Sequence, residues 1–276
     1  MAAADPPTRP GWDAATYHQV SGVQEAWGRE LAEAFDWRGD ETVLDAGCGT
    51  GRVARYLLKR IPTGRLVAVD ADARMIETAG RTLAAEIENG RARLVQSDLL
   101  EFSPETPVDV VFSNAVFHWI ADHDRLWARC RQWLRPRGWL WAQGGGQGNL
   151  EPELALAREV ASRPPYAGRT AGFVRDHHFA KPEATRRRLI RAGLVASRVD
   201  LEPKTTPLEE PEHFEPFVRT VILRHYQAVL GPELFEAFVG EWLRAHLRRF
   251  GPRLHYVRLN VRARRPTDGR GAGGEG

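Results

Sequence analysis

The chain has 276 residues, of which 42% are hydrophobic and 27% charged, and its formal net charge is +3. This length and apolar content suit a globular protein with a substantial core. No stretch approaches the roughly 18 consecutive apolar residues that a membrane-spanning helix needs, and the N-terminus lacks the basic and apolar regions of a secretory signal. We therefore predict a soluble cytoplasmic protein without a membrane partner.

The cysteines and the basic residues argue against a disulfide-rich, a metal-binding or a nucleic-acid-binding protein. Cys48 and Cys130 are the only cysteines, and neither has metal-ligating neighbours in sequence, so we predict neither a disulfide scaffold nor a metal site. The basic residues are almost all arginine, are interspersed with 36 acids, and recur at helical spacing in 186–191 and 244–250. This pattern indicates solvated helix faces rather than a nucleic-acid surface.

Strand-like and helix-like segments alternate in the first half of the chain. A helix is expected first over 21–35, with Ser21 as its cap. The strands expected after it cover 41–47, 64–70, 92–98, 107–114 and 138–145, and the helices between them cover 52–61, 71–90 and 122–134. Because apolar strands separated by helices indicate a parallel sheet covered on both faces, residues 39–145 predict a doubly wound α/β unit.

The second half of the chain follows a different pattern. We expect helices over 151–162 and 183–194, a strand over 195–203, two amphipathic helices within 209–250 and a last strand over 253–265. Residues 266–276 offer no apolar segment to bury, so this tail is predicted to be disordered. No internal repeat is found.

The segment TVLDAGCGTGR, residues 42–52, places glycines at the first strand-to-helix turn. Gly47, Gly49 and Gly51 lack a Cβ, so the chain can turn sharply and a ligand can contact its backbone. Ligands of open α/β sheets bind at the carboxyl ends of the strands. A dinucleotide loop has the spacing GxGxxG, and here Arg52 occupies the third glycine position. This disfavours a nicotinamide-dependent dehydrogenase, which stays open as an alternative.

Three acids stand at the ends of successive expected strands. Asp45 precedes the glycines, and Asp70 and Asp98 close the next two strands. A single aspartate in such a place is usually a helix cap. A carboxylate beside a diphosphate would meet like charge, whereas it attracts a cation. Together the three acids predict a cofactor that is positively charged and carries no phosphate.

On these segments the chain resembles the class I S-adenosylmethionine-dependent methyltransferases. The segments that carry the resemblance are 43–51, 67–70, 95–98, 108–114 and 134–142. The resemblance implies a Rossmann-like, mostly parallel seven-stranded sheet in a domain over 39–265, with a helical cap over about 205–252 before the last strand. It also implies an N-terminal helical lid over 1–38.

The resemblance further implies which residues hold S-adenosylmethionine. Those residues are Asp45, Gly47, Gly49, Gly51, Asp70, Ala71, Met75, Asp98, Leu99 and Asn114. In this assignment Asp70 holds the ribose, Asp98 contacts the adenine amino group, and Asn114 lies beside the sulfonium. A protein that binds this cofactor without catalysing a reaction is the remaining alternative.

The segment NAVFHWIADHDRL, residues 114–126, is similar to the small-molecule branch that includes trans-aconitate methyltransferase. This implies a small organic acceptor methylated at oxygen, with a carboxylate as a candidate. His118 is expected to act as a base or an orienting group, or simply to pack in a loop. Candidate acceptor contacts are Tyr17, Trp119, Arg224 and Tyr226. Tyr17 is alternatively a packing aromatic, and Arg224 is alternatively a solvated arginine.

Overall fold

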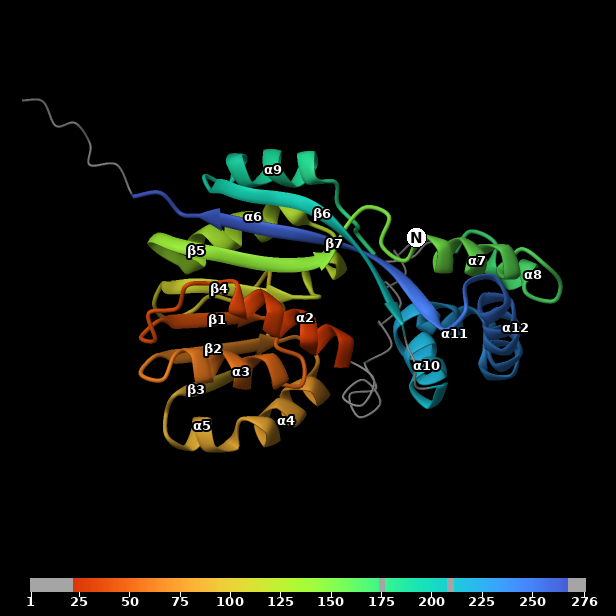
Figure 1. Cartoon of the computed structure of the whole chain (residues 1–276), viewed down its shortest axis with the longest axis horizontal. Coiled ribbons are helices and arrows are strands. Elements are labelled where there is room, and N and C mark those ends of the chain that lie inside the picture. Colours follow the sequence, from red (N-terminus) through yellow and green to blue (C-terminus); the bar gives the residue numbers. More distant parts are fainter. Residues whose placement is uncertain (1–21, 174–176, 208–210, 268–276) are drawn as a thin grey trace, which may run out of the picture.

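The computed structural model describes residues 22–173, 177–207 and 211–267. Within them seven strands form one sheet in the order β3-β2-β1-β4-β5-β7-β6 (Figure 1). The strands are β1 (Thr42–Ala46), β2 (Arg65–Asp70), β3 (Ala92–Gln96), β4 (Val108–Asn114), β5 (Leu134–Gly145), β6 (Val195–Pro207) and β7 (Arg253–Arg264). The first five pair in parallel, and β7 runs antiparallel to β5 and β6. The prediction of a mostly parallel seven-stranded sheet is confirmed.

Helices cover both faces of this sheet. On one face lie α2 (Gly22–Glu33), α3 (Arg52–Arg60), α4 (Ala73–Thr82) and α5 (Ala84–Glu88), and on the other α6 (His123–Trp133) and α9 (Pro182–Arg191). Successive strand residues point to opposite faces. Val43 accordingly packs in the core that contains Leu57 of α3, and Leu44 packs in the core that contains Trp127 of α6. The unbroken apolar strands of the sequence are explained by this double covering.

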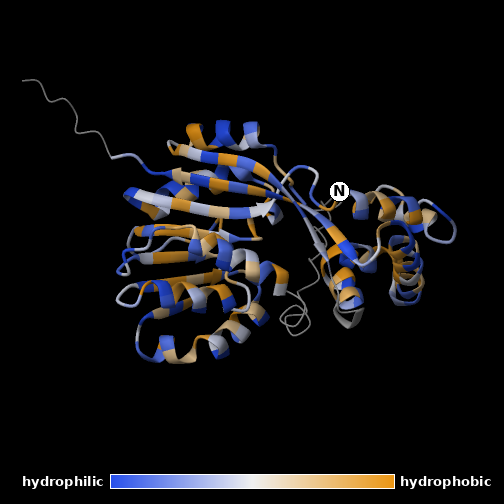
Figure 2. Cartoon of the chain, viewed as in Figure 1, coloured by the Kyte–Doolittle hydropathy of each residue, from blue (hydrophilic) through white to orange (hydrophobic). Residues whose placement is uncertain are grey.

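A helical lobe stands beside the sheet, and β6 and β7 extend from the sheet toward it (Figure 1). It contains α7 (Glu151–Ala161), α8 (Ala167–Thr170), α10 (Pro211–Phe217), the π-helical segment η2 (Val218–Ile222), α11 (Arg224–Leu230) and α12 (Pro232–Phe250). Hydrophobic and hydrophilic residues alternate along its helices (Figure 2), which is the pattern of helices that share a buried side. Phe217, Phe238 and Trp242 are fully buried in its core. The lobe therefore includes 151–170 as well as 211–250, whereas residues 205–207 of the expected cap belong to β6.

Several elements differ from those expected. The helix over 71–90 is divided at Leu83, which is fully buried between α4 and α5. The two helices within 209–250 are replaced by α10, η2, α11 and α12. Gly231 at φ +75° followed by Pro232 separates α11 from α12, since a left-handed glycine ends a helix and proline begins one. Most of the predicted tail and the first part of the predicted lid lie outside the described residues.

None of the helices in the described parts of the chain is long and apolar enough to cross a membrane.

Candidate active site

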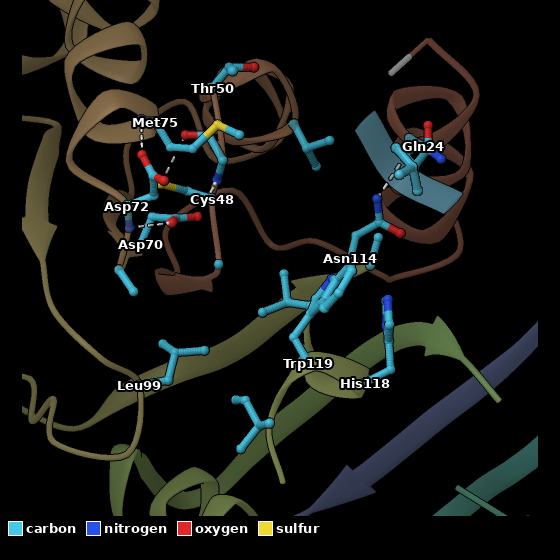
Figure 3. Close-up of a pocket in the computed structure, with 18 of the residues that line it drawn as sticks. Gln24, Cys48, Thr50, Asp70, Asp72, Met75, Leu99, Asn114, His118 and Trp119 are labelled. Atoms are coloured by element: carbon cyan, nitrogen blue, oxygen red, sulfur yellow. Dashed lines mark hydrogen bonds between the residues drawn. The ribbon is translucent and has the colours of Figure 1, made fainter. Parts of the chain in front are cut away.

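A cavity of about 380 Å³ lies where the carboxyl ends of β1, β2 and β4 meet the helical lobe. This volume is within the range of small-molecule sites in proteins. Loops after these strands form most of its wall, and Val221 and Arg224 of the lobe complete it. Figure 3 shows Asp70, Met75 and Leu99 on one side of the cavity and Asn114 and His118 on the other.

The residues predicted to hold the cofactor meet at this cavity with one exception. Those that line it are Asp45, Gly47, Gly49, Asp70, Ala71, Met75, Asp98, Leu99 and Asn114. Gly51 does not line it. Gly51 precedes α3 at φ +81°, and a Cβ there would lie 3.2 Å from Ala79 Cα of α4. Its conformation and the close packing of these two helices explain this glycine.

The glycine turn is held against the end of β2. The amides of Gly47 and Cys48 donate to the carbonyl oxygen of Val69 at 2.8 and 2.9 Å, and the amide of Gly49 donates to Asp70 Oδ2 at 2.9 Å. Gly47 has φ +87°, and a Cβ there would lie 2.2 Å from Cγ2 of Val116. This position therefore requires glycine for both its backbone angle and its space.

We predict that Gly47→Ala is more destabilising than Gly49→Ala. Both glycines have positive φ, which costs alanine about 1–2 kcal/mol. Only at position 47 does the added methyl group collide with a neighbour, which adds about 1–3 kcal/mol of overpacking. Denaturant unfolding of the two variants measures the difference. Equal losses would show that Val116 moves aside without cost.

Asp45, which is buried, and Asp70, which is half-buried, both line the cavity. Asp45 is 2% exposed, and its Oδ2 has no hydrogen-bond partner in the part of the chain that the structure describes. Burial, with a smaller contribution from the charge of Asp70, raises the pKa of Asp45 to about 7. Burial also raises the pKa of Asp70. A cation in the cavity would stabilise both carboxylates.

The oxygens of Asp70 are oriented by the backbone. Oδ2 accepts from Gly49 N at 2.9 Å and Oδ1 accepts from Asp72 N at 3.0 Å. The backbone amide of Ala71 also interacts with this carboxylate. A carboxylate has about four acceptor positions, so Asp70 retains acceptor capacity for a ligand. Two neighbouring hydroxyl groups, such as those of a ribose, match this arrangement.

The wall beyond Asp70 is apolar. Met75 is 3% and Leu99 6% exposed, and both line the cavity. Asp98, beside Leu99, is exposed, and its Oδ1 accepts from Leu100 N at 2.8 Å. Asp98 therefore stabilises the turn after β3 through its own side chain. It also lines the cavity, as do Met75 and Leu99, whose apolar side chains suit a flat ring.

Helix α2 closes one side of the cavity. Asn114 Nδ2 donates to the carbonyl oxygen of Gln24 at 2.8 Å, and Gln24 and Glu25 belong to the lining. Gly28 permits this approach, because a Cβ there would lie 2.6 Å from Cγ2 of Val53. Tyr17 of the predicted lid lies outside the described residues.

Aromatic and basic side chains form the end of the cavity near the lobe. His118 and Trp119 come from the 3₁₀ turn η1 (Phe117–Trp119), and both line the cavity. The Trp119 ring lies 4.1 Å from the His177 ring, and Cζ of Arg224 lies 5.0 Å from the Trp119 centroid. The structure thus brings Trp119, Arg224 and His118 together at this end of the cavity and adds His177 to them.

Tyr226, also predicted as an acceptor contact, does not line the cavity. It is 2% exposed in the core of the lobe, where its ring lies 4.7 Å from those of Phe173 and Phe238. Helix α11 turns Arg224 toward the cavity and Tyr226 away from it, because residues two apart on a helix do not share a face.

Arg258 is one of the lining residues that sequence reasoning missed. It is 2% exposed on β7, its Nε donates to Gln143 Oε1 at 3.2 Å, and its Nη2 donates to Asn114 Oδ1 at 3.4 Å. Its guanidinium lies 4.7 Å from the Trp27 ring centroid. The only sequence signal was an arginine within an alternating strand, and the position of β7 between β5 and β6 brings that arginine to the cavity.

Comparison with known proteins finds a similar domain in part of the chain. Residues 43–138 match the family described as a methyltransferase domain. A trans-aconitate 2-methyltransferase of Azoarcus sp. (strain BH72) is 34% identical over 163 residues, which cover 59% of this chain and 61% of that protein. The chain thus spans about three fifths of the length of this curated relative.

Solved structures share the fold at low sequence identity. Haemonchus contortus phosphoethanolamine N-methyltransferase 2, solved in complex with S-adenosyl-L-methionine, has a TM-score of 0.57 and 18% identity, with 92% of this chain and 57% of that chain covered. A geranyl diphosphate methyltransferase in complex with the same cofactor has a TM-score of 0.52 and 17% identity, with 95% and 93% covered. Residues 43–138 therefore match a methyltransferase domain, and the sheet to which they belong has the fold of these two methyltransferase structures.

Proposed function

We propose that this chain, built around a class I methyltransferase domain, transfers the methyl group of S-adenosylmethionine to a carboxylate oxygen of a small organic acid. The observation that carries the proposal is the separation of charge along the cavity. Asp45, Asp70, Asp72 and Asp98 line it near the strand ends, and Arg224 and Arg258 line it near the lobe and on β7. Glu25 and Arg52 also line it, and they pair with each other at 3.0 Å. Opposite ends of one cavity thus favour a cationic cofactor and an anionic acceptor.

The acidic end suits the parts of S-adenosylmethionine. The buried Oδ2 of Asp45 offers an acceptor to a cationic group, and the Asp70 carboxylate offers its remaining acceptor capacity to the ribose hydroxyls. Met75 and Leu99 provide apolar contact for the adenine. When bound, the cofactor supplies a methyl group carried by a sulfonium. The sulfur is a good leaving group because it departs as a neutral thioether. The diphosphate of a nicotinamide dinucleotide would be repelled by the two carboxylates of Asp45 and Asp70, which argues against such a cofactor.

The chain's own residues then have two tasks at the other end. Arg258 and Arg224 attract the acid and orient its carboxylate, since guanidinium groups hold carboxylates in a fixed geometry. Trp119, His177 and Phe179 cover the acceptor space and limit the access of water. Holding the nucleophile in line accounts for most of the catalysis expected in such a transfer. The trans-aconitate relative supports an acid of this kind as the acceptor.

The proposal is tested by incubating the full chain with methyl-labelled S-adenosylmethionine and a panel of small di- and tricarboxylic acids that includes trans-aconitate. We expect a labelled methyl ester of at least one acid, identified by mass spectrometry. Calorimetry should show binding of S-adenosylmethionine and none of NAD. Tight cofactor binding without transfer to any acid, alcohol or amine would instead support a non-catalytic binding protein.

Replacing Arg258 by methionine should raise KM for the acid by about 10- to 100-fold, the usual effect of losing a hydrogen bond to a charged oxygen. Arg264→Met is the matched control. Arg264 lies on the same strand and stacks 5.3 Å from the Trp139 ring centroid, but it does not line the cavity. Steady-state kinetics of both variants should separate them. Equal increases in KM in the two variants would contradict the assignment of Arg258 to the acceptor.

A further inference from the structure

His118 is placed in the cavity with one ring nitrogen already occupied. Its Nδ1 accepts a hydrogen bond from the backbone amide of Gly145 at 3.2 Å, and its side chain is 9% exposed. A backbone amide can only donate, so Nδ1 is the ring nitrogen without hydrogen. In the neutral imidazole the proton is then on Nε2. The end of β5 therefore fixes the tautomer of this histidine.

The surroundings of His118 keep it neutral. The groups that face it are Arg258 of β7, the rings of Trp119, His177 and Phe179, and His123 of α6. Burial, followed by the positive charge of Arg258 and the influence of His123, lowers the pKa of His118 to about 3. No carboxylate among the described residues forms a hydrogen bond or ion pair with its ring to oppose this effect.

From this geometry we infer that His118 is a hydrogen-bond donor and not a general base: its Nε2–H donates to the carboxylate of the acceptor and holds one oxygen while the other attacks. The inference rests on the proposed function. Figure 3 shows the His118 ring directed toward Asn114, on the side of the cavity opposite Asp70 and Asp72. The position is thus at the acceptor end and not at the ribose end.

The electron balance of ester formation agrees with a donor. The new C–O bond takes its electron pair from the carboxylate oxygen, and the pair of the broken S–C bond stays on sulfur. The sulfonium and the carboxylate lose their charges together, and no proton is released. An alcohol or amine acceptor, by contrast, has a proton to lose, which requires a base. A histidine fixed as a donor therefore selects acceptors that arrive already ionised.

The first test reads the tautomer directly in the protein without added ligand. Nitrogen-15 chemical shifts of the His118 ring should show neutral imidazole protonated at Nε2 from about pH 5 to about pH 8, the range in which an ordinary histidine changes charge. His118→Gln identifies the signal by its disappearance. A hydrogen on Nδ1, or an imidazolium at about pH 7, would overturn the inference whatever the enzyme methylates.

The second test uses two substitutions and the acid of the panel that is methylated fastest. His118→Gln retains an N–H donor but cannot act as a base, and it should keep activity within about 3-fold, whereas His118→Leu should raise KM by about 10- to 100-fold with a smaller change in kcat. Equal loss in both variants would overturn the donor role. So would a limb in the pH profile of kcat/KM near the ordinary histidine pKa that disappears in His118→Gln. If the tautomer is as expected but no acid reacts, the proposed function fails and the tautomer stands.

Discussion

Asp70→Ala loses most of the affinity of the chain for S-adenosylmethionine, with an expected increase in Kd of 100-fold or more. Two hydrogen bonds to an ionised oxygen contribute about 1.5–3 kcal/mol each, and a tenfold change in Kd corresponds to about 1.4 kcal/mol. The substitution also releases the amide of Gly49, which donates to Asp70 Oδ2. Titration calorimetry with S-adenosylmethionine measures the loss.

Asp109→Ala is the control for this substitution. Asp109 is a β4 aspartate whose Oδ2 accepts from a backbone amide, that of Thr42 at 2.9 Å, but it lies at the start of β4 and outside the cavity lining. It should lower stability and leave cofactor affinity unchanged. Retained micromolar binding in Asp70→Ala would contradict the assignment of Asp70 to the ribose.

Asp45→Asn should stabilise the protein without cofactor and at the same time weaken cofactor binding. The folded-state pKa of Asp45 is about 7, above the ordinary value of 3.8. A carboxyl group with a raised pKa favours folding in its neutral form, so its contribution is full below pH 3.8 and is lost as the pH rises through about 7. Asparagine stays neutral at every pH. The gain at pH 8 should be a few kcal/mol, with about 4 kcal/mol as an upper bound at about 1.4 kcal/mol per pKa unit.

Binding follows the opposite trend. A cationic cofactor favours ionised Asp45, so the affinity of the unmodified protein should fall as the pH drops through about 7, and that of Asp45→Asn should change little over the same range. Chemical denaturation at pH 6 and 8 and calorimetry at the same values measure both effects. Asp98→Asn is the control, because Asp98 lines the same cavity but is exposed and should give no gain in stability. An Asp45→Asn protein that is less stable at pH 8 would show that its carboxylate is paired in a way that burial alone does not indicate.

The cofactor end of the site could be predicted because it is local in sequence. In a parallel sheet each strand ends at the same edge, so Asp45, Asp70 and Asp98 follow from the ends of three predicted strands. The turn at Gly47 follows in the same way, since its positive φ is a property of a few consecutive residues. Gly51 belongs to the same motif but has a packing role, which the motif alone does not distinguish.

The acceptor end was only partly predictable, because it is assembled from distant segments. Arg258 reaches the cavity because β7 inserts antiparallel between β5 and β6, and His177 reaches Trp119 across 58 positions of sequence. The tautomer of His118 depends on Gly145, a residue of another strand. The prediction that Tyr226 contacts the acceptor was wrong. An amphipathic sequence predicts a helix, but it does not show whether a given tyrosine packs in the core or faces a cavity.

The amino-acid sequence by itself determined the sheet, the glycine turn and the acidic cofactor end, since these follow from strand and helix periods and from residues within one turn of each other. The tertiary structure alone decided which basic residues line the cavity, the extent of the helical lobe and the contact of His118 with Gly145. The physical reason is that electrostatics and hydrogen bonds act through space: the pKa of His118 is set by burial and by Arg258, which is 140 positions away along the chain and beside it in the fold.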